Sequence, residues 1–230
     1  MHKKSWKLCE VIGLVLILGS WLLEWQSVRK WSDAYNEYWK SITTINEAFY
    51  TAENRVAMQF ELAINRSVQS INLDPNDFAS AYKEAWKHDQ IRKVWYEQSL
   101  LGIQRSETVL KFISRMSLEH GLRLSSDLDS LIYQQLQLSK KLGTLIDSND
   151  PASQVIQIPG LNTISLVQAG KIKREISALV SALTEPLNEL GKAMQSKCRS
   201  RSRYHAVLFT VGSLLLITAK LKEWFIEKKK

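Results

Sequence analysis

Two apolar runs lie near opposite ends of the chain, and a long polar stretch separates them. The first is Val11 to Leu23 and the second is Ala206 to Ala219. Neither run alone has the ~20 residues that a membrane-spanning helix needs, but apolar flanks extend both. Trp residues near both ends of the first run and after the end of the second are typical of a membrane–water interface. The pattern therefore predicts transmembrane helices at residues 8–25 and 204–222.

These spans leave a basic N-terminal tail at 1–7, an extramembrane region at 26–203 and a basic C-terminal tail at 223–230. Two spans place both tails on one side of the membrane. Buried core helices or amphipathic anchors are the alternative, but neither run has a polar face. The first run lacks a small-residue cleavage site, which indicates an uncleaved signal anchor. Lys and Arg near the membrane are balanced between the two sides, so the orientation stays open.

The extramembrane region begins with a seven-residue repeat of apolar positions, which is typical of helices packed side by side. The predicted bundle seam consists of Val28, Tyr35, Ile42, Phe49 and Val56, with Trp31, Tyr38, Ile45 and Ala52 three positions later. No Pro or Gly interrupts the chain from Ser20 to Asp74. We therefore expect the first span to continue as one helix to about Leu73.

Turn and capping residues divide the remainder into three further helices. Pro75 should end the first helix, and a second should run from about Asp77 to Glu119. The sequence Ser126 to Asp129 has the form of a capping box for a third, and residues 148–160 form a loop rich in turn residues. A fourth helix should follow, in which Pro186 marks either a kink or the first turn of a new helix. The predicted fold class is all-α, an antiparallel bundle of long helices between two transmembrane helices.

The charge of the chain is strongly basic, with a net charge of +8 and a pI of about 9.4. The densest basic cluster adjoins the second span and contains Lys197, Arg199, Arg201 and Arg203. Beside a membrane, these side chains are candidates for contact with anionic lipid headgroups. Acidic and basic residues alternate elsewhere, which argues against direct nucleic-acid binding. Cys9 and Cys198 would lie at opposite faces of the bilayer, so they are not expected to pair within one chain.

The sequence contains no pattern that indicates catalysis. None of the four His residues has the spacing to another His or Cys that a helical metal site needs. The glycines are scattered singly, so a phosphate-binding loop is not expected, and no nucleophile motif is present. We therefore expect no enzyme activity, no catalytic residues, no metal and no cofactor.

By layout, with two terminal spans around a helical region, the chain resembles the two-span membrane effectors of bacterial anti-phage systems such as retrons. The resemblance covers architecture alone and transfers no residue. It implies a protein of the bacterial inner membrane that a regulatory protein or protein–nucleic-acid complex restrains. Once released, it would self-associate, contact membrane lipids and permeabilise the bilayer. The alternative is a membrane-anchored sensor or scaffold, because the layout is also similar to the span–bundle–span half of bacterial chemoreceptors.

Overall fold

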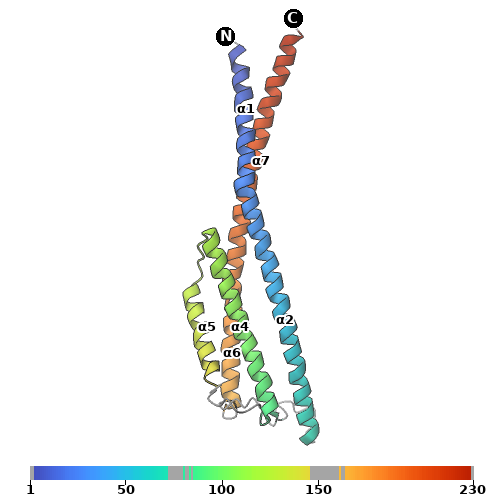
Figure 1. Cartoon of the computed structure of the whole chain (residues 1–230), viewed down its shortest axis with the longest axis vertical. Coiled ribbons are helices and arrows are strands. Elements are labelled where there is room, and N and C mark those ends of the chain that lie inside the picture. The colour runs from blue at the N-terminus through green and yellow to red at the C-terminus, as the bar shows by residue number, and fades with distance from the viewer. Residues whose placement is uncertain are drawn as a thin grey trace, which may run out of the picture. The chain divides into compact units, whose positions relative to one another are not determined.

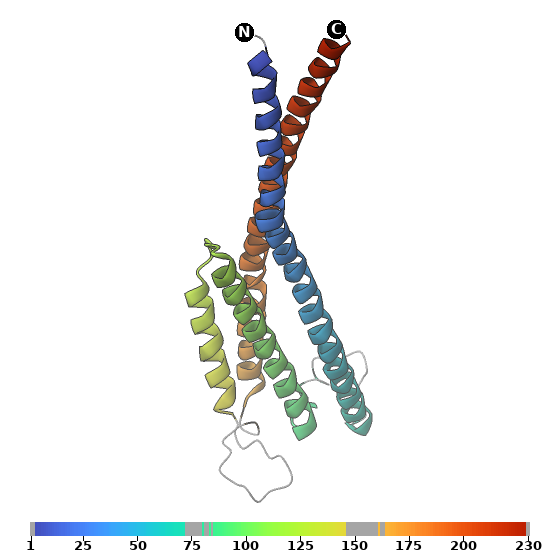
Figure 2. The same cartoon turned by 45° about the horizontal axis from the view of Figure 1, so that its top comes forward.

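The computed structural model describes residues 3–71, 80, 83, 85–145, 161 and 164–228. Within these residues every regular element is a helix, so the predicted all-α class is confirmed (Figures 1 and 2). The chain divides into two compact units. The first unit joins Met1–Lys40 to Gly191–Lys230, and the second unit is Ser41–Leu190. The division therefore falls inside the predicted extramembrane region.

The N-terminal part of the chain is one uninterrupted helical rod, and its continuation beyond the first apolar run was predicted from the absence of Pro and Gly after Ser20. It consists of α1 (Lys3–Leu23), a π-helical turn η1 (Glu24–Val28) and α2 (Arg29–Ile71). The backbone N–H of Arg29 donates to the carbonyl of Glu24, which is the i to i+5 bond of a π turn. This turn lies where the predicted first span ends and was not foreseen from the sequence.

The next helix, α4 (Asp89–His120), begins later than predicted, because a turn at residues 86–88 separates it from the helical residues before it. The turn is held by Arg92, whose guanidinium donates to the carbonyls of Trp86 (2.8 Å) and Lys87 (3.0 Å). The Trp86 ring packs edge-on against Trp95 in the core. The predicted stop at Pro75 lies outside the described residues.

Helix α4 ends at Gly121, which has the left-handed conformation (φ 58°). The N–H groups of Gly121 and Leu122 bond to the carbonyls of Leu118 and Ser117. This pair of bonds caps the last turn, and the positive φ explains why Gly stands here.

Helix α5 (Leu128–Gly143) has a different cap from the predicted one. The side chain of Asp127 accepts a hydrogen bond from the Ser130 N–H at 3.1 Å, so Asp127 is the N-cap and the predicted Ser126 box is wrong. Ser126 instead bonds to the Glu189 carboxylate. The predicted loop at 148–160 lies outside the described residues.

The fourth predicted helix is two helices, α6 (Leu166–Ala182) and α7 (Thr184–Glu227), separated at Leu183. Pro186 lies in the first turn of α7, where a missing N–H costs nothing, so the second of its two predicted roles is confirmed. Helix α6 begins with a capping box between Ser165 and Gln168. Helix α7 runs through the basic cluster into the second apolar run without a break.

The second unit has its apolar core among α4, α5 and α6, which run antiparallel in chain order (Figures 1 and 2). Core side chains from these helices are almost fully buried: Ile91, Trp95, Ile103, Leu142, Ile172, Ile176 and Leu179. Helix α2 joins this cluster near its end, through Ile64 with Phe60 and Ala63. The predicted antiparallel bundle is therefore present in this unit.

Candidate functional site

The first unit pairs α1 with the C-terminal half of α7, and the two helices approach most closely at Gly13 and Gly212 (Figure 1). A Cβ atom on either glycine would lie 2.9 Å from the carbonyl oxygen of the other. Only a residue without a side chain fits there, because real Cβ atoms do not approach a backbone oxygen so closely. Small residues at such a crossing are typical of helices that associate in lipid.

Two more small residues continue this contact on either side of the glycines. Ser20 on α1 is fully buried, and its hydroxyl donates to the carbonyl of His205 at 3.4 Å. Ala219 on α7 is 2% exposed. The inner face of the pair therefore carries small residues from both helices, with Ile17 and Leu216 packed against the two glycines.

A pair of polar side chains lies at each end of the contact. The Lys220 ammonium is 3.1 Å from the Glu10 carboxylate and 3.0 Å from Glu223. At the other end the Nε2 atom of His205 is 3.3 Å from the Glu24 carboxylate, and the His205 ring stacks on Phe209. No local pattern in the sequence predicts that these side chains pair across the two helices.

The outer surface of the pair is apolar. Large side chains that point away from the contact include Leu8, Val11, Leu14, Val15, Leu18, Trp21 and Leu22 on α1, and Val207, Phe209, Val211, Leu214, Ile217 and Leu221 on α7. Two helices of the described chain are long and apolar enough to cross a membrane, judged by length and composition. The predicted membrane character is therefore supported at this coarse level.

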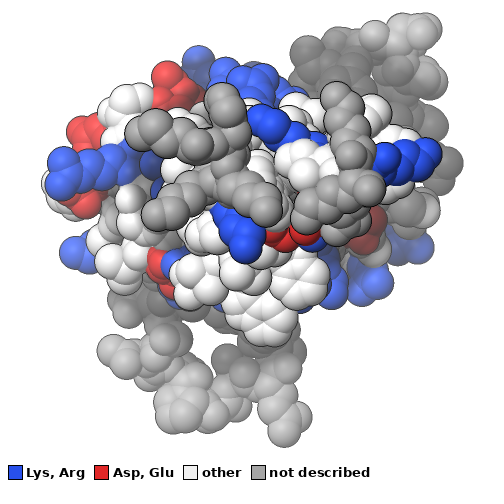
Figure 3. Space-filling model, turned by 90° about the horizontal axis from the view of Figure 1, so that it is seen from above, with Lys and Arg blue, Asp and Glu red and all other residues white. Residues whose placement is uncertain are grey.

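The predicted lipid-contact residues Lys197, Arg199, Arg201 and Arg203 are all exposed on α7 in the first unit. Alternate residues of an α-helix point about 200° apart, so the four side chains form two pairs on opposite sides of the helix. The cluster is thus a collar around α7, which we call the basic collar. Lys and Arg also dominate the charged surface seen in Figure 3.

The predicted bundle seam is buried unevenly. Val56 is buried, whereas Val28, Tyr35, Ile42 and Phe49 are half-buried. A straight helix drifts by ~20° per heptad from a 3.5-residue repeat, so a strict seven-residue pattern cannot stay at the centre of a contact.

The most buried residues of the first part of α2 are Ala34 and Tyr38. The Tyr38 ring lies against Gly191, where a Cβ would come within 2.8 Å of its hydroxyl. Burial raises the pKa of the Tyr38 phenol, and the neighbouring Tyr35 adds to the rise. Its burial and its contact with Gly191 place Tyr38, which belongs to the second set of predicted seam positions, at the centre of this contact.

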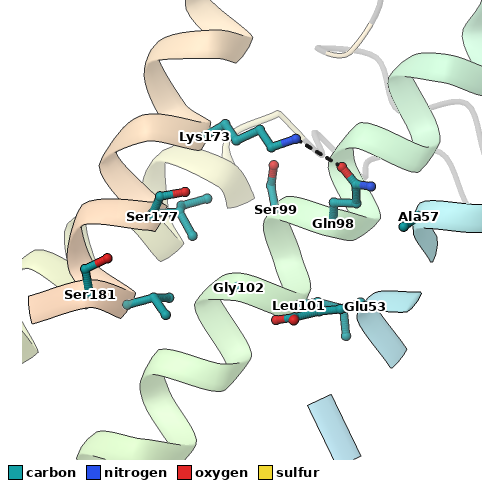
Figure 4. Close-up of a pocket in the computed structure, with 11 residues that line it drawn as sticks. Glu53, Ala57, Gln98, Ser99, Leu101, Gly102, Lys173, Ser177 and Ser181 are labelled. Atoms are coloured by element: carbon teal, nitrogen blue, oxygen red, sulfur yellow. Dashed lines mark hydrogen bonds between the residues drawn. The ribbon is translucent and has the colours of Figure 1, made fainter. Parts of the chain in front are cut away.

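The second unit contains a groove between α2, α4 and α6 with a volume of about 430 Å³ (Figure 4). Figure 4 shows Lys173 of α6 reaching toward Gln98 of α4, and their polar atoms are 3.5 Å apart. Glu53 of α2 also lines the groove and is held by Arg105 at 3.1 Å. The remaining lining is small or apolar: Ala57, Ser99, Leu101, Gly102, Ile176, Ser177, Val180 and Ser181.

The Glu189 carboxylate of α7 bonds to Ser125 and Ser126 in the segment between α4 and α5, and we call this contact the Glu189 clamp. Glu189 accepts hydrogen bonds from the backbone N–H groups of Ser125 and Ser126, both at 3.1 Å, and from both serine hydroxyls. These bonds, led by that of the Ser125 hydroxyl, lower the pKa of the Glu189 carboxyl. The clamp joins residues more than sixty positions apart, so no local sequence signal could have revealed it.

Comparison with protein-family models, curated proteins and solved structures finds no match to this chain. The function of the protein is therefore inferred from the arrangement of the chain's own residues. Gly212 is the main functional candidate that sequence reasoning missed, since a search for paired glycines within one helix cannot find a partner on another.

Proposed function

We propose that the protein is an integral membrane effector with two spans, which oligomerises and perturbs or permeabilises the membrane when a partner releases it. The resemblance in layout to retron-type effectors suggests the bacterial inner membrane as its location and anti-phage defence as its context. The partner would be a regulatory protein or a protein–nucleic-acid complex that restrains the second unit.

The observation that carries this proposal is the thinness of the apolar layer between the two pairs of polar side chains. On α1 the layer extends from Glu10 to Glu24, which is about 21 Å at 1.5 Å per residue. On α7 it extends from His205 to Lys220, about 22 Å. The hydrocarbon core of a bilayer is ~30 Å thick. A pair of helices with charges locked at this spacing must thin the bilayer around it or draw charges into the hydrocarbon.

The internal pairing of the polar groups adds a second argument. Glu10, Lys220, Glu24, His205 and Ser20 all have partners across the pair. The outward surface of one chain therefore offers apolar side chains to lipid. A single chain has no polar path for water, so permeabilisation requires several chains that thin the same patch of bilayer.

The basic collar has the charge and arrangement expected for contact with anionic lipid headgroups. Its four cations surround α7, so some of them face lipid headgroups whichever way the helix is rotated. Each basic residue near an anionic surface contributes ~1 kcal/mol of attraction. This geometry fits a lipid surface better than a single partner helix, which would contact one face only.

The first test is membrane integrity during induced expression in bacteria, measured by propidium iodide uptake and a potential-sensitive dye. We expect rapid depolarisation, and we expect it to disappear when residues 206–219 are deleted. Intact membranes with the full-length protein would count against the effector and favour the sensor or scaffold.

A sharper test alters the thickness of the apolar layer. The double change Glu10→Leu and Lys220→Leu replaces one charged pair with apolar side chains, so we expect less leakage from a better-matched span. Lys30→Leu with Asp33→Leu is the matched control, because it also removes two opposite charges but lies on α2 beyond Glu24. Equal leakage from both variants would show that the mismatch is not the cause.

The contribution of the basic collar can be measured separately. Changing Arg199, Arg201 and Arg203 together to Ser should reduce depolarisation while the protein still inserts. The corresponding change to Lys keeps the charges and should preserve it. If the Ser variant depolarises as fast as the parent, the collar has no part in the activity.

The groove in the second unit favours a sensor as the second candidate function. Its volume lies within the range of small-molecule sites, and it combines apolar side chains with Lys173, Gln98 and three serines. In that case the two apolar helices would only anchor the bundle. Intact membranes, combined with a loss of partner signalling in a Lys173→Ala variant, would support this candidate.

A further inference from the structure

A hollow of about 710 Å³ lies along one face of the rod where α1 passes into η1. It belongs to the first unit and does not overlap the contact between Gly13 and Gly212. Its lining is Leu18, Trp21, Leu22, Glu24, Trp25 and Arg29. Neither the paired helices nor the basic collar accounts for it.

The π turn explains why these residues share one face. In an α-helix, residues five apart differ by about 1.4 turns and point to different sides. In a π turn the i to i+5 hydrogen bond brings them about one turn apart. Arg29 donates such a bond to Glu24, so its side chain stands beyond that of Glu24 along the rod. The α1 residues Leu18, Trp21 and Leu22 are three and four apart and continue the same face.

The side chains of the hollow follow a polarity gradient along the rod. Leu18 and Leu22 are apolar, Trp21 and Trp25 are amphipathic, and Arg29 is cationic. The one acidic residue of the lining, Glu24, has His205 of α7 as its partner at 3.3 Å. The two Trp side chains are 69% and 72% exposed, although large aromatic surfaces are usually covered in folded proteins. The Arg29 guanidinium lies over the Trp25 ring, 5.5 Å from its centroid. The described part of the chain gives Arg29 no carboxylate partner.

This order matches the order of groups in a phospholipid. Acyl chains would lie on the leucines and Trp21, the ester region on Trp25, and the phosphodiester on Arg29. Guanidinium and phosphate form strong charge-assisted hydrogen bonds. Trp and Arg at the boundary of an apolar run are the residues expected at that depth of a bilayer.

A second copy of the chain fits the same face poorly. Copies inserted in the same direction are related by an axis along the membrane normal, so identical residues meet across a symmetric contact. Arg29 would then face Arg29, and Glu24 would face Glu24. Like charges brought together repel, which opposes a symmetric contact at this face.

We propose that this hollow is a binding site for one phospholipid, with its phosphodiester on Arg29 and its acyl chains on Leu18, Trp21 and Leu22. The inference rests on the membrane insertion contained in the proposed function. It adds a specific lipid site on α1 and η1, on a different helix from the basic collar.

The test is native mass spectrometry of the full-length protein in detergent, with palmitoyl-oleoyl phosphatidylglycerol as the probe. The corresponding diacylglycerol has the same chains without the phosphate and serves as the probe control. We expect the protein to retain the phospholipid and not the diacylglycerol. The Arg29→Gln variant should bind it about tenfold more weakly, as expected for the loss of one charge-assisted hydrogen bond. Lys30→Gln is the matched control, since Lys30 is adjacent and exposed but does not line the hollow.

A second variant tests the site without altering the π turn, in case the Gln substitution at Arg29 disturbs that turn. Trp21→Ala removes apolar surface two turns away and should also weaken retention. Circular dichroism and flotation with vesicles confirm that each variant folds and inserts. Equal retention by the parent, Arg29→Gln and Lys30→Gln would overturn the site.

The remaining outcomes separate this inference from the proposal on which it rests. Diacylglycerol retained as well as the phospholipid would remove the role of the phosphate and overturn the assignment. Dimers that dissociate on Trp21→Ala would assign the face to a second copy instead. If the parent protein does not float with vesicles, membrane insertion itself fails. If it floats but Arg29→Gln changes nothing, only the lipid site is lost.

Discussion

The two units of the molecule distribute polar and apolar side chains in opposite ways. In the apolar part of the first unit, where α1 meets the C-terminal half of α7, most large apolar side chains face outward, and small residues and paired polar side chains lie between the helices. In the second unit, large apolar side chains fill the interior, and most charged side chains are exposed. Both units are helical, but the helices of the two units associate for different physical reasons.

Burial of apolar surface drives the association of helices in water, so the second unit gains from each large side chain in its core. Within hydrocarbon that driving force is absent between helices, and close backbone contact and hydrogen bonds take its place. The first unit has the features of the second kind of association. Substitutions that have opposite effects in the two units therefore test the comparison directly.

The largest effect is expected from a large-to-small change in the core of the second unit. Leu179 is 2% exposed, so Leu179→Ala should lower the free energy of unfolding by about 2–5 kcal/mol through lost burial and a cavity. Leu136 is 51% exposed, and Leu136→Ala should change the free energy of unfolding by at most about 0.5 kcal/mol. Urea unfolding followed by circular dichroism measures both. Similar losses in the two variants would contradict the assigned core.

A small-to-large change should be the damaging one in the first unit. Gly13→Leu places a side chain against the backbone of Gly212 and should cost about 1–3 kcal/mol of helix pairing. Gly19 on the same helix has no atom within 4 Å of its Cβ position, so Gly19→Leu should have little effect.

The pairing can be followed with a short thiol-reactive cross-linker between Glu10→Cys and Lys220→Cys, after Cys9 and Cys198 are changed to Ser. We expect the cross-linked yield to fall in Gly13→Leu and to persist in Gly19→Leu. A yield that survives both changes would show that the helices do not meet at Gly13.

Two glycines of the second unit should respond with opposite signs. A Cβ on Gly102 would lie 2.6 Å from Ile176 Cγ2, so Gly102→Ala should destabilise the unit by about 1 kcal/mol after the gain in helix propensity. Gly170 in α6 has open space around it, and Gly170→Ala should stabilise by about 0.5–1 kcal/mol. Thermal unfolding of the Gly102→Ala and Gly170→Ala variants distinguishes the two effects. An equal shift in melting temperature would mean that α4 and α6 are not in close contact.

The smallest effect is expected from the pH dependence of the Glu189 clamp. Hydrogen bonds from Ser125 and Ser126 hold the pKa of the Glu189 carboxyl below its ordinary value of 4.5. The clamp is therefore fully present above the ordinary value and is lost as the pH falls through the lowered one. Glu189→Gln should flatten this part of the stability profile. An acid loss of stability as steep as that of the parent would assign the loss to other carboxyl groups.

Much of the fold could be predicted because its signals are local. The continuation of the rod beyond Ser20 follows from the absence of Pro and Gly, and the start of α7 follows from Pro186. Local signals gave a wrong prediction where a residue distant in sequence forms the hydrogen bond that the local pattern assigned to a neighbour. Ser126 had the sequence of a cap, but Glu189 recruits it, and Asp127 caps the helix instead. The turn at 86–88 likewise depends on Arg92 and on the packing of Trp86.

The sequence by itself determined that the chain is helical, that apolar runs lie near its two ends and that a basic collar adjoins the second. These properties depend on composition and on periods of a few residues. Only the three-dimensional structure shows that Gly13 meets Gly212, that Glu24 meets His205 and that Glu10 meets Lys220. Such contacts join residues more than 180 positions apart, and helical periodicity shows which face is buried but not which partner covers it.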